Sequence, residues 1–136
     1  LEKGANPNIQ YKGSGSSLIL AAVESDDPEV INLLLEYGAK AELDYALLMA
    51  AAHNNHPQII DILIKSGAKV DVISQGYTPL MYAAAHTSNP EVIDRLLEHG
   101  ADPAIDSNDG QNAIDYAKKN EALKNTDIIN KLDIAE

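Results

Sequence analysis

The side chains in this sequence best suited to bind a metal ion are four histidines, His53, His56, His86 and His99. His53 and His86 occupy matching positions in two similar segments, so they could line one groove. Packed helices lie about 8–10 Å apart, however, whereas ligands of one zinc ion must each come within about 2 Å of it. We therefore predict no metal and no other cofactor. That a protonated His53/His86 pair makes partner binding depend on pH stays a hypothesis.

The residue combinations of the common enzyme classes are missing from the sequence. It contains no cysteine, no Gly-x-Ser-x-Gly, no phosphate-binding loop and no His-Glu-x-x-His. The glycine-rich segment 13–16 has neither a preceding strand nor a lysine, so it predicts a turn. Asp26 and Asp27 are expected in a solvated loop, where one of them caps a helix. We therefore predict that the protein is not an enzyme.

Composition and charge narrow the range of partners. The chain has 136 residues, enough for one domain, and its aromatic residues (4%) are all tyrosine, so a core of Leu, Ile, Val and Ala is expected. A net charge of −11 argues against nucleic acid and anionic membranes and is compatible with a basic partner protein. No stretch approaches the ~20 apolar residues of a membrane span. We expect a soluble monomer and favour the cytoplasm, although the lack of cysteine does not select a compartment.

One thirteen-residue pattern occurs three times and predicts three helices. The copies run from Asp27 to Ala39, from His56 to Ala68 and from Asn89 to Ala101. In each copy a polar N-cap candidate precedes proline at the first helical position, and glycine ends the helix. Asp27 and Asn89 are good N-caps, whereas His56 is a weaker candidate.

Shorter apolar segments predict a partner helix beside each of these three, and a final pair. The expected segments are 16–24, capped by Ser16, with Leu18, Ala21 and Ala22 apolar; a helix through Leu47 and Ala51 that starts at Glu42 or Asp44; a helix at 79–85, capped by Thr78; and helices at 112–119 and 126–133. The alanine pairs 21–22, 50–51 and 83–84 permit close approach of neighbouring helices. Fewer residues connect Gly38 to Leu47 than connect the later units.

The order Gly-x-Thr-Pro-Leu-x-x-Ala-Ala, followed by Asn-Pro-Glu-Val-Ile-x-x-Leu-Leu-x-x-Gly-Ala-Asp, resembles the ankyrin repeat between Gly76 and Pro103. The resemblance covers essentially the whole chain and implies an all-α solenoid of stacked helix-turn-helix units with short hairpin loops. We divide the chain into the tail of a preceding partial repeat (1–10), three repeats (11–39, 40–72, 73–105) and a C-terminal capping repeat (106–136). The tail predicts that the chain is a piece of a longer protein, or that its start is cut or disordered. The shortened 38–47 connection predicts a notch in the binding edge.

The resemblance also implies a nonenzymatic module that binds another protein on a concave face, made of loop tips and the first helix of each pair. A rigid spacer within a longer multidomain chain and an inhibitor of a partner enzyme are the alternatives. Joint exposure of Tyr11, Tyr77 and His86 on the concave face would favour binding, and a uniformly charged face would favour the spacer.

Candidate binding residues are those that the repeat scaffold does not need. Tyr77 and Tyr11 are the expected anchors, because tyrosine combines a large contact area with a polar tip. Tyr82 lies on a more apolar helix and is expected to pack. On the loops the candidates are Tyr11, Lys12, Ser74, Gln75, Tyr77, Ser107, Asn108, Asp109 and Gln111, and near the ends of the first helices they are Glu24, His53, Asn54 and His86.

Overall fold

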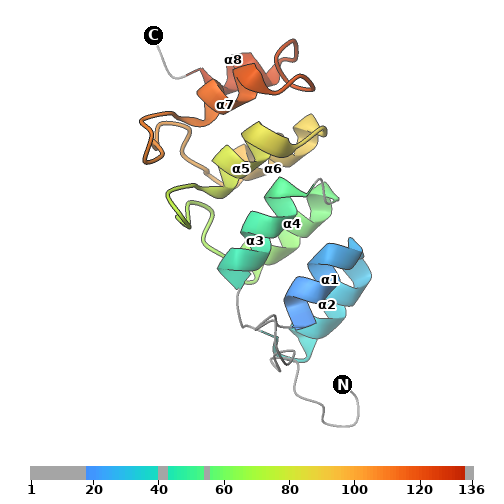
Figure 1. The fold of residues 1–136 in the computed structure, drawn as a ribbon. Coiled ribbons are helices and arrows are strands. Elements are labelled where there is room, and N and C mark those ends of the chain that lie inside the picture. Colours follow the sequence, from blue (N-terminus) through green and yellow to red (C-terminus); the bar gives the residue numbers. More distant parts are fainter. Residues whose placement is uncertain (1–17, 40–42, 54–55, 134–136) are drawn as a thin grey trace.

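The computed structural model describes residues 18–39, 43–53 and 56–133, and within these ranges the chain forms eight helices in four pairs (Figure 1). The pairs are α1 (Leu18–Ser25) with α2 (Pro28–Glu36), α3 (Leu43–Ala52) with α4 (Pro57–Lys65), α5 (Pro79–His86) with α6 (Pro90–Glu98), and α7 (Ala113–Lys119) with α8 (Ile128–Leu132). Extended pairing in the described residues is limited to an isolated bridge between Ser74 and Tyr77.

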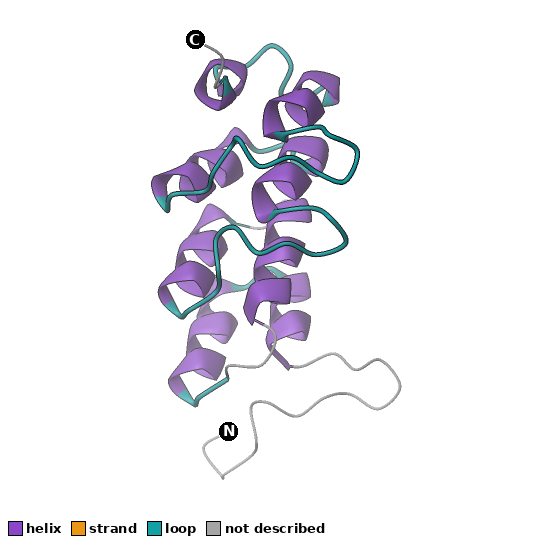
Figure 2. Cartoon of the chain, turned by 90° about the vertical axis from the view of Figure 1, so that its left-hand side faces the viewer, coloured by secondary structure: helices purple, strands orange, loops and turns teal. Residues whose placement is uncertain are grey.

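The four pairs stack in two columns, as Figure 2 shows. The first helices α1, α3, α5 and α7 contact one another in sequence, and the second helices α2, α4, α6 and α8 do the same. This is the all-α solenoid expected from the sequence. The connections 68–78 and 101–112 form two hairpin loops that project in the same direction (Figure 2).

Local capping explains where the second helices begin and end. The carboxylate of Asp27 accepts a hydrogen bond from the backbone N–H of Glu29 (3.0 Å), and the amide oxygen of Asn89 accepts one from Glu91 (3.1 Å). Proline follows each of these caps, as predicted. The glycines that end the three helices have φ between 90° and 115°, a conformation in which a Cβ is strained.

Two predicted helix starts are corrected or refined. His56 makes no capping bond through its own side chain. Helix α3 begins at Leu43, so Asp44 lies in its first turn; its carboxylate accepts the backbone N–H of Lys69 (2.7 Å) at the start of the next loop. Thr78 caps α5 by accepting from the N–H of Met81 (3.2 Å), as expected.

The last helices are close to expectation. Asn112 caps α7 reciprocally with Asp115, so the predicted 112–119 helix is confirmed. The final helix is shorter than 126–133: it begins at Ile128, and the hydroxyl of Thr126 bonds the carbonyl of Leu123 instead. The cap at Ser16, the tail at 1–10 and the turn at 13–16 lie outside the described residues, as does part of the 38–47 connection with its predicted notch.

Aliphatic side chains and alanine make up the core. Ala46, Ala50, Ala51, Ala83 and Ala84 are fully buried where neighbouring first helices meet. Ala22 is also buried, whereas Ala21 stays half-exposed because Ile19 and Val23 supply the buried face of α1. Small side chains let the first helices approach closely, and this is the role that we predicted for the alanine pairs.

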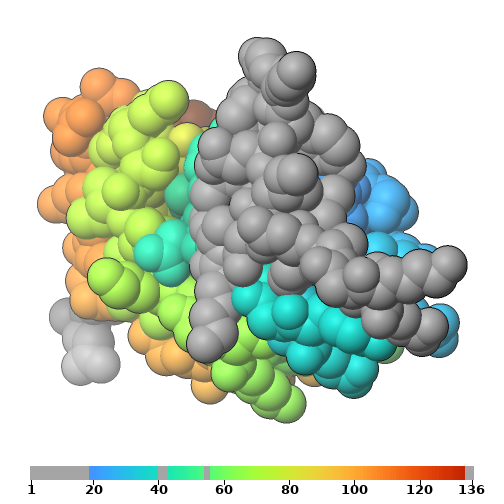
Figure 3. Space-filling model, turned by 90° about the horizontal axis from the view of Figure 1, so that it is seen from below, coloured from blue at the N-terminus to red at the C-terminus, as the bar shows by residue number. Residues whose placement is uncertain are grey.

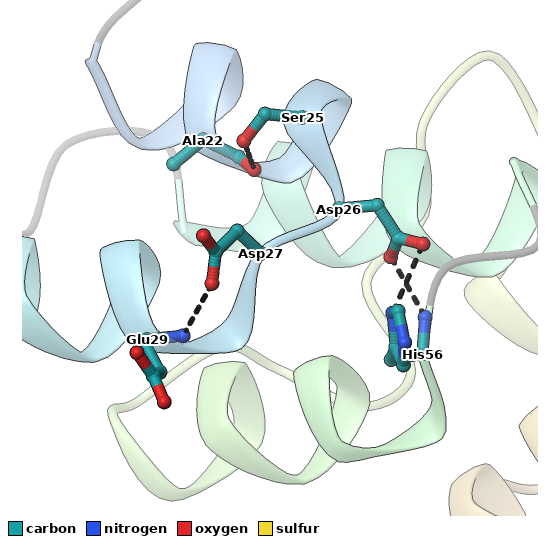
Figure 4. Close-up of polar contacts among 6 residues, drawn as sticks. All are labelled: Ala22, Ser25, Asp26, Asp27, Glu29 and His56. Atoms are coloured by element: carbon teal, nitrogen blue, oxygen red, sulfur yellow. Dashed lines mark hydrogen bonds and ion pairs between the residues drawn. The ribbon is translucent and has the colours of Figure 1, made fainter.

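Hydrogen bonds and ion pairs of aspartate side chains link consecutive helix pairs. Asp26 accepts a hydrogen bond from the backbone N–H of His56 (2.8 Å) and lies 3.0 Å from its ring Nδ1 (Figure 4). Asp26 therefore joins the first pair to the second, while its neighbour Asp27 caps α2, so the two carboxylates have separate structural tasks. Asp61 on α4 pairs with Arg95 of α6 and with His99, the C-cap residue of α6. Asp94 on α6 pairs with Lys131 of α8. No described helix is long and apolar enough to cross a membrane.

Candidate functional site on the inner face

A tight turn at the tip of the first hairpin holds Tyr77 directly after it. Gln75 and Gly76 both have positive φ (55° and 88°), and Ser74 and Tyr77 exchange two backbone hydrogen bonds of 2.9 and 3.0 Å. This pattern is a two-residue hairpin turn in which both central residues are left-handed. Because Thr78 directly caps α5, the turn holds Tyr77 at a defined position beside that helix.

The second hairpin rests on the first. Gly76 lies against the side chain of Asn108, so the tips of the two hairpins touch. Figure 3, a view from the N-terminal end, shows the yellow-green hairpin and the orange hairpin side by side. Ser107 is buried (7% exposed) and accepts a hydrogen bond from the hydroxyl of Tyr116 (2.8 Å). Ser107 was predicted as a candidate for partner contact; in the structure its hydroxyl fixes the loop to α7.

The first helices expose larger side chains at a repeating position. Met49, Tyr82 and Tyr116 each lie two residues after the corresponding core residue in α3, α5 and α7. All three are half-exposed. Tyr45, in the first turn of α3, is 51% exposed. We call the surface formed by the first helices and the two hairpins the inner face.

Polar residues border this surface near the ends of the first helices. Glu24, His53 and His86 occupy equivalent positions in α1, after α3 and in α5, and all three are exposed. Residues of this kind were predicted to reach the groove, and the structure places each of them beside a hollow.

Three adjoining hollows run along the inner face. The first is lined by Val23, Glu24, Asp26, Met49 and His53. The second shares Met49 and His53 with the first and adds Tyr45, Leu48, Ala52 and Tyr82. The third, of about 400 Å³, shares Tyr82 with the second and adds Gln75, Tyr77, Met81, Ala85, His86 and Tyr116. Because neighbours share lining residues, the hollows form one groove from α1 to α7.

Aromatic rings dominate the third hollow. The ring centroid of Tyr77 lies 5.5 Å from that of Tyr82 and 6.0 Å from that of Tyr116, with interplanar angles of 55° and 67°. The ring of His86 lies 6.5 Å from Tyr82 in a stacked arrangement. Tyr116, and after it the carboxylate of Asp109, raises the pKa of the Tyr77 hydroxyl above its ordinary value of 10.0, because ionised Tyr77 would meet neighbouring negative charge.

Comparison with known families agrees with this architecture. The family model described as "Ankyrin repeats (3 copies)" matches residues 1–74, 18–107 and 48–132. The chain belongs to the ankyrin repeat family. Among curated proteins, none matches the sequence. The ankyrin assignment explains the stacked pairs and their hairpins, and ankyrin repeats are generally modules of protein–protein interaction.

On this ankyrin scaffold, several candidate residues chosen from the sequence come together. Gln75, Tyr77 and His86 line one hollow, and Glu24 and His53 line another. Ser74 closes the hairpin turn, Asn108 covers Gly76, and the side chain of Gln111 accepts a hydrogen bond from Lys119 (2.8 Å). Tyr11, Lys12 and Asn54 lie outside the described residues.

The sequence interpretation missed part of the groove. Tyr82 was expected to pack rather than to anchor a partner; its ring packs against Tyr77, but it is half-exposed and also lines two hollows. Tyr45, Met49 and Tyr116 were not considered. The repeat register contained a usable signal, because Met49, Tyr82 and Tyr116 share one position in successive units.

The histidines have separate surroundings. His56 and His99 lie at helix ends in the second column, where they pair with Asp26 and Asp61. His53 and His86 line adjoining hollows of the groove. Within the described ranges, no three His, Asp or Glu side chains gather as a metal site would require.

Proposed function

We propose that this ankyrin domain binds a partner protein in the groove of its inner face, which is the concave face predicted from the sequence. The observation that carries the proposal is the distribution of tyrosine. Four of the six tyrosines in the chain, Tyr45, Tyr77, Tyr82 and Tyr116, lie along this one groove. Half-exposed tyrosines are typical anchors of protein interfaces, since they bury a large area and keep a hydroxyl available.

The composition of the groove favours a binding module over a rigid spacer. Met49, Ala52, Met81 and Ala85 provide apolar lining between the aromatic rings, with a few polar groups at the margins. A spacer that binds nothing gains no stability from exposing such side chains along one connected surface. Inhibition of a partner enzyme is a special case of this binding and uses the same groove.

The experiment compares capture of partners by the natural chain and by a Tyr77→Ala/His86→Ala variant, followed by affinity measurements with each purified partner. Tyr37→Ala is the matched control, because Tyr37 is 40% exposed but lies at the end of α2 in the other column. We expect the double variant to lose partners that Tyr37→Ala retains. Identical partner sets and affinities for all three proteins would exclude the inner face as the binding surface.

A further inference from the structure

Three tyrosine rings from three parts of the chain meet in the third hollow. Tyr77 comes from the hairpin turn, whereas Tyr82 and Tyr116 come from equivalent positions of α5 and α7. Each ring is half-exposed, and all three line the same hollow. The flanking rings are inclined to Tyr77 by 55° and 67°, so the three tyrosines do not form a parallel stack, while His86 stacks on Tyr82 from the side of α5.

Aromatic rings grouped in this way attract positive charge. The face of a tyrosine ring carries the negative part of its quadrupole, and a cation within about 6 Å of the ring centroid is stabilised. A hollow bordered by several inclined rings lets one cation contact more than one ring. The other lining residues, Met81 and Ala85 among them, provide apolar contact for the methylene stem of a long side chain.

The charges around the hollow have the matching sign. The two hairpins, residues 68–78 and 101–112, contain Asp71, Asp102, Asp106 and Asp109 against one lysine, Lys69. The pKa of the Tyr77 hydroxyl is raised by Tyr116 first and by Asp109 second, which agrees with a negative potential at this ring. On α7, the ammonium of Lys119 is bonded to Gln111. With a net charge of −11 for the whole chain, the local and global potentials both favour a cationic ligand.

We infer that the hollow formed by Tyr77, Tyr82 and Tyr116 binds the cationic side chain, lysine or arginine, of the partner segment that occupies the groove. This inference rests on the proposed function, since it names the chemistry of the partner at one point of the same surface. The cation sits against the tyrosine rings, and the aspartates of the hairpins supply the long-range attraction.

The direct test titrates the isotopically labelled full chain with N-acetylarginine amide and follows the tyrosine ring resonances by NMR. The neutral isostere N-acetylcitrulline amide is the matched probe, because it keeps the shape and removes the charge. We expect concentration-dependent shifts of Tyr77, Tyr82 and Tyr116 with the arginine probe, with a dissociation constant of roughly 30–400 mM for a single cation–π contact. Tyr37, at the end of α2, is the internal control and should not shift.

Receptor variants separate ring contact from folding. Tyr82→Leu should weaken binding of the arginine probe by roughly 2- to 30-fold, the range expected from the loss of one cation–π contact. Tyr82→Phe keeps the ring and should retain the affinity, and Tyr37→Leu should change nothing. Equal shifts with the arginine and citrulline probes, or no shift of the three rings with either, would overturn the inference.

The two proposals fail in distinguishable ways. If partner binding depends on Tyr77 and His86 but the arginine probe does not bind at the three rings, the groove is the interface and its partner inserts a neutral side chain. If the probe binds but the Tyr77→Ala/His86→Ala variant keeps every partner at unchanged affinity, the cation site exists and the proposed function is wrong.

Discussion

Gly76 at the tip of the first hairpin lies directly against the side chain of Asn108 in the second; a Cβ added to Gly76 would overlap the side-chain amide of Asn108. This contact joins the hairpins of neighbouring repeats at the edge of the tyrosine hollow. The position of Tyr77 therefore depends on the conformation of its own turn and on the loop of the next repeat.

Substitution of that glycine should affect both stability and the groove. Gly76→Ala places a Cβ at a φ of +88°, which costs roughly 1–2 kcal/mol, and displaces the exposed Asn108 side chain. Gly38→Ala is the matched control, because Gly38 has φ +93° and nothing near its added Cβ. Urea unfolding should show similar losses for both variants, whereas only Gly76→Ala should weaken binding of the arginine probe. A probe affinity unchanged by Gly76→Ala would show that the Gly76–Asn108 contact does not position Tyr77.

The hydroxyl and the ring of Tyr116 should have separable effects. Tyr116→Phe removes the hydrogen bond to the buried hydroxyl of Ser107 and leaves the ring in the hollow. We expect a loss of about 1 kcal/mol in the free energy of unfolding, with binding of the arginine probe retained. Tyr37→Phe serves as the control for stability. An unchanged free energy of unfolding in Tyr116→Phe would show that the bond to Ser107 does not stabilise the second hairpin. Loss of binding of the arginine probe would show that the Tyr116 hydroxyl itself belongs to the binding site.

Asp61 should matter more for stability than Asp94, although the two occupy the same position in consecutive copies of the repeated pattern. The side chain of Asp61 is 17% exposed and holds both Arg95 and His99, whereas that of Asp94 is 31% exposed and holds Lys131 alone. Asp61→Ala is expected to destabilise the fold by about 1 kcal/mol, since screening by solvent reduces the pair with Arg95. Asp94→Ala should lower the free energy of unfolding by less than Asp61→Ala does. Denaturant titration of both variants measures the two losses. Equal losses would contradict the burial argument.

The alkaline titration of Tyr77 should respond to its neighbours. Its pKa is raised because ionised Tyr77 would lie beside Tyr116 and Asp109. Below its ordinary value of 10.0 both folded and unfolded chains keep the proton, so any stability linked to this group is lost only as pH rises through the raised pKa. Tyr116→Phe should lower the pKa most and Asp109→Asn less, measured by NMR titration of the ring. A pKa of Tyr77 unchanged in both variants would contradict the assigned causes.

Local interactions made much of the ankyrin fold readable from the sequence. The Asp27 and Asn89 caps, the prolines that follow them and the terminal glycines act within a few residues, so their patterns predicted the helices. The alanine pairs predicted the close contacts of the first helices, and the ordered motifs between Gly76 and Pro103 carried the resemblance to the ankyrin family, which the family model confirms. The candidate residues near the hairpin turn, Gln75 and Tyr77, could also be chosen, because the scaffold itself does not need them.

Tertiary structure decided which side chains share the groove. Whether Tyr82 packs or faces the hollow depends on the rotation of α5 against α3 and α7, which periodicity within one helix does not specify. Ser107 is buried because Tyr116, from the following helix, reaches its hydroxyl. Asp26 holds His56 across two repeats, and Asn108 covers Gly76 across two hairpins. Capping and periodicity involve residues close together in the chain, so they can be recognised as sequence patterns. These contacts instead join distant residues that only the stacking of repeats brings together.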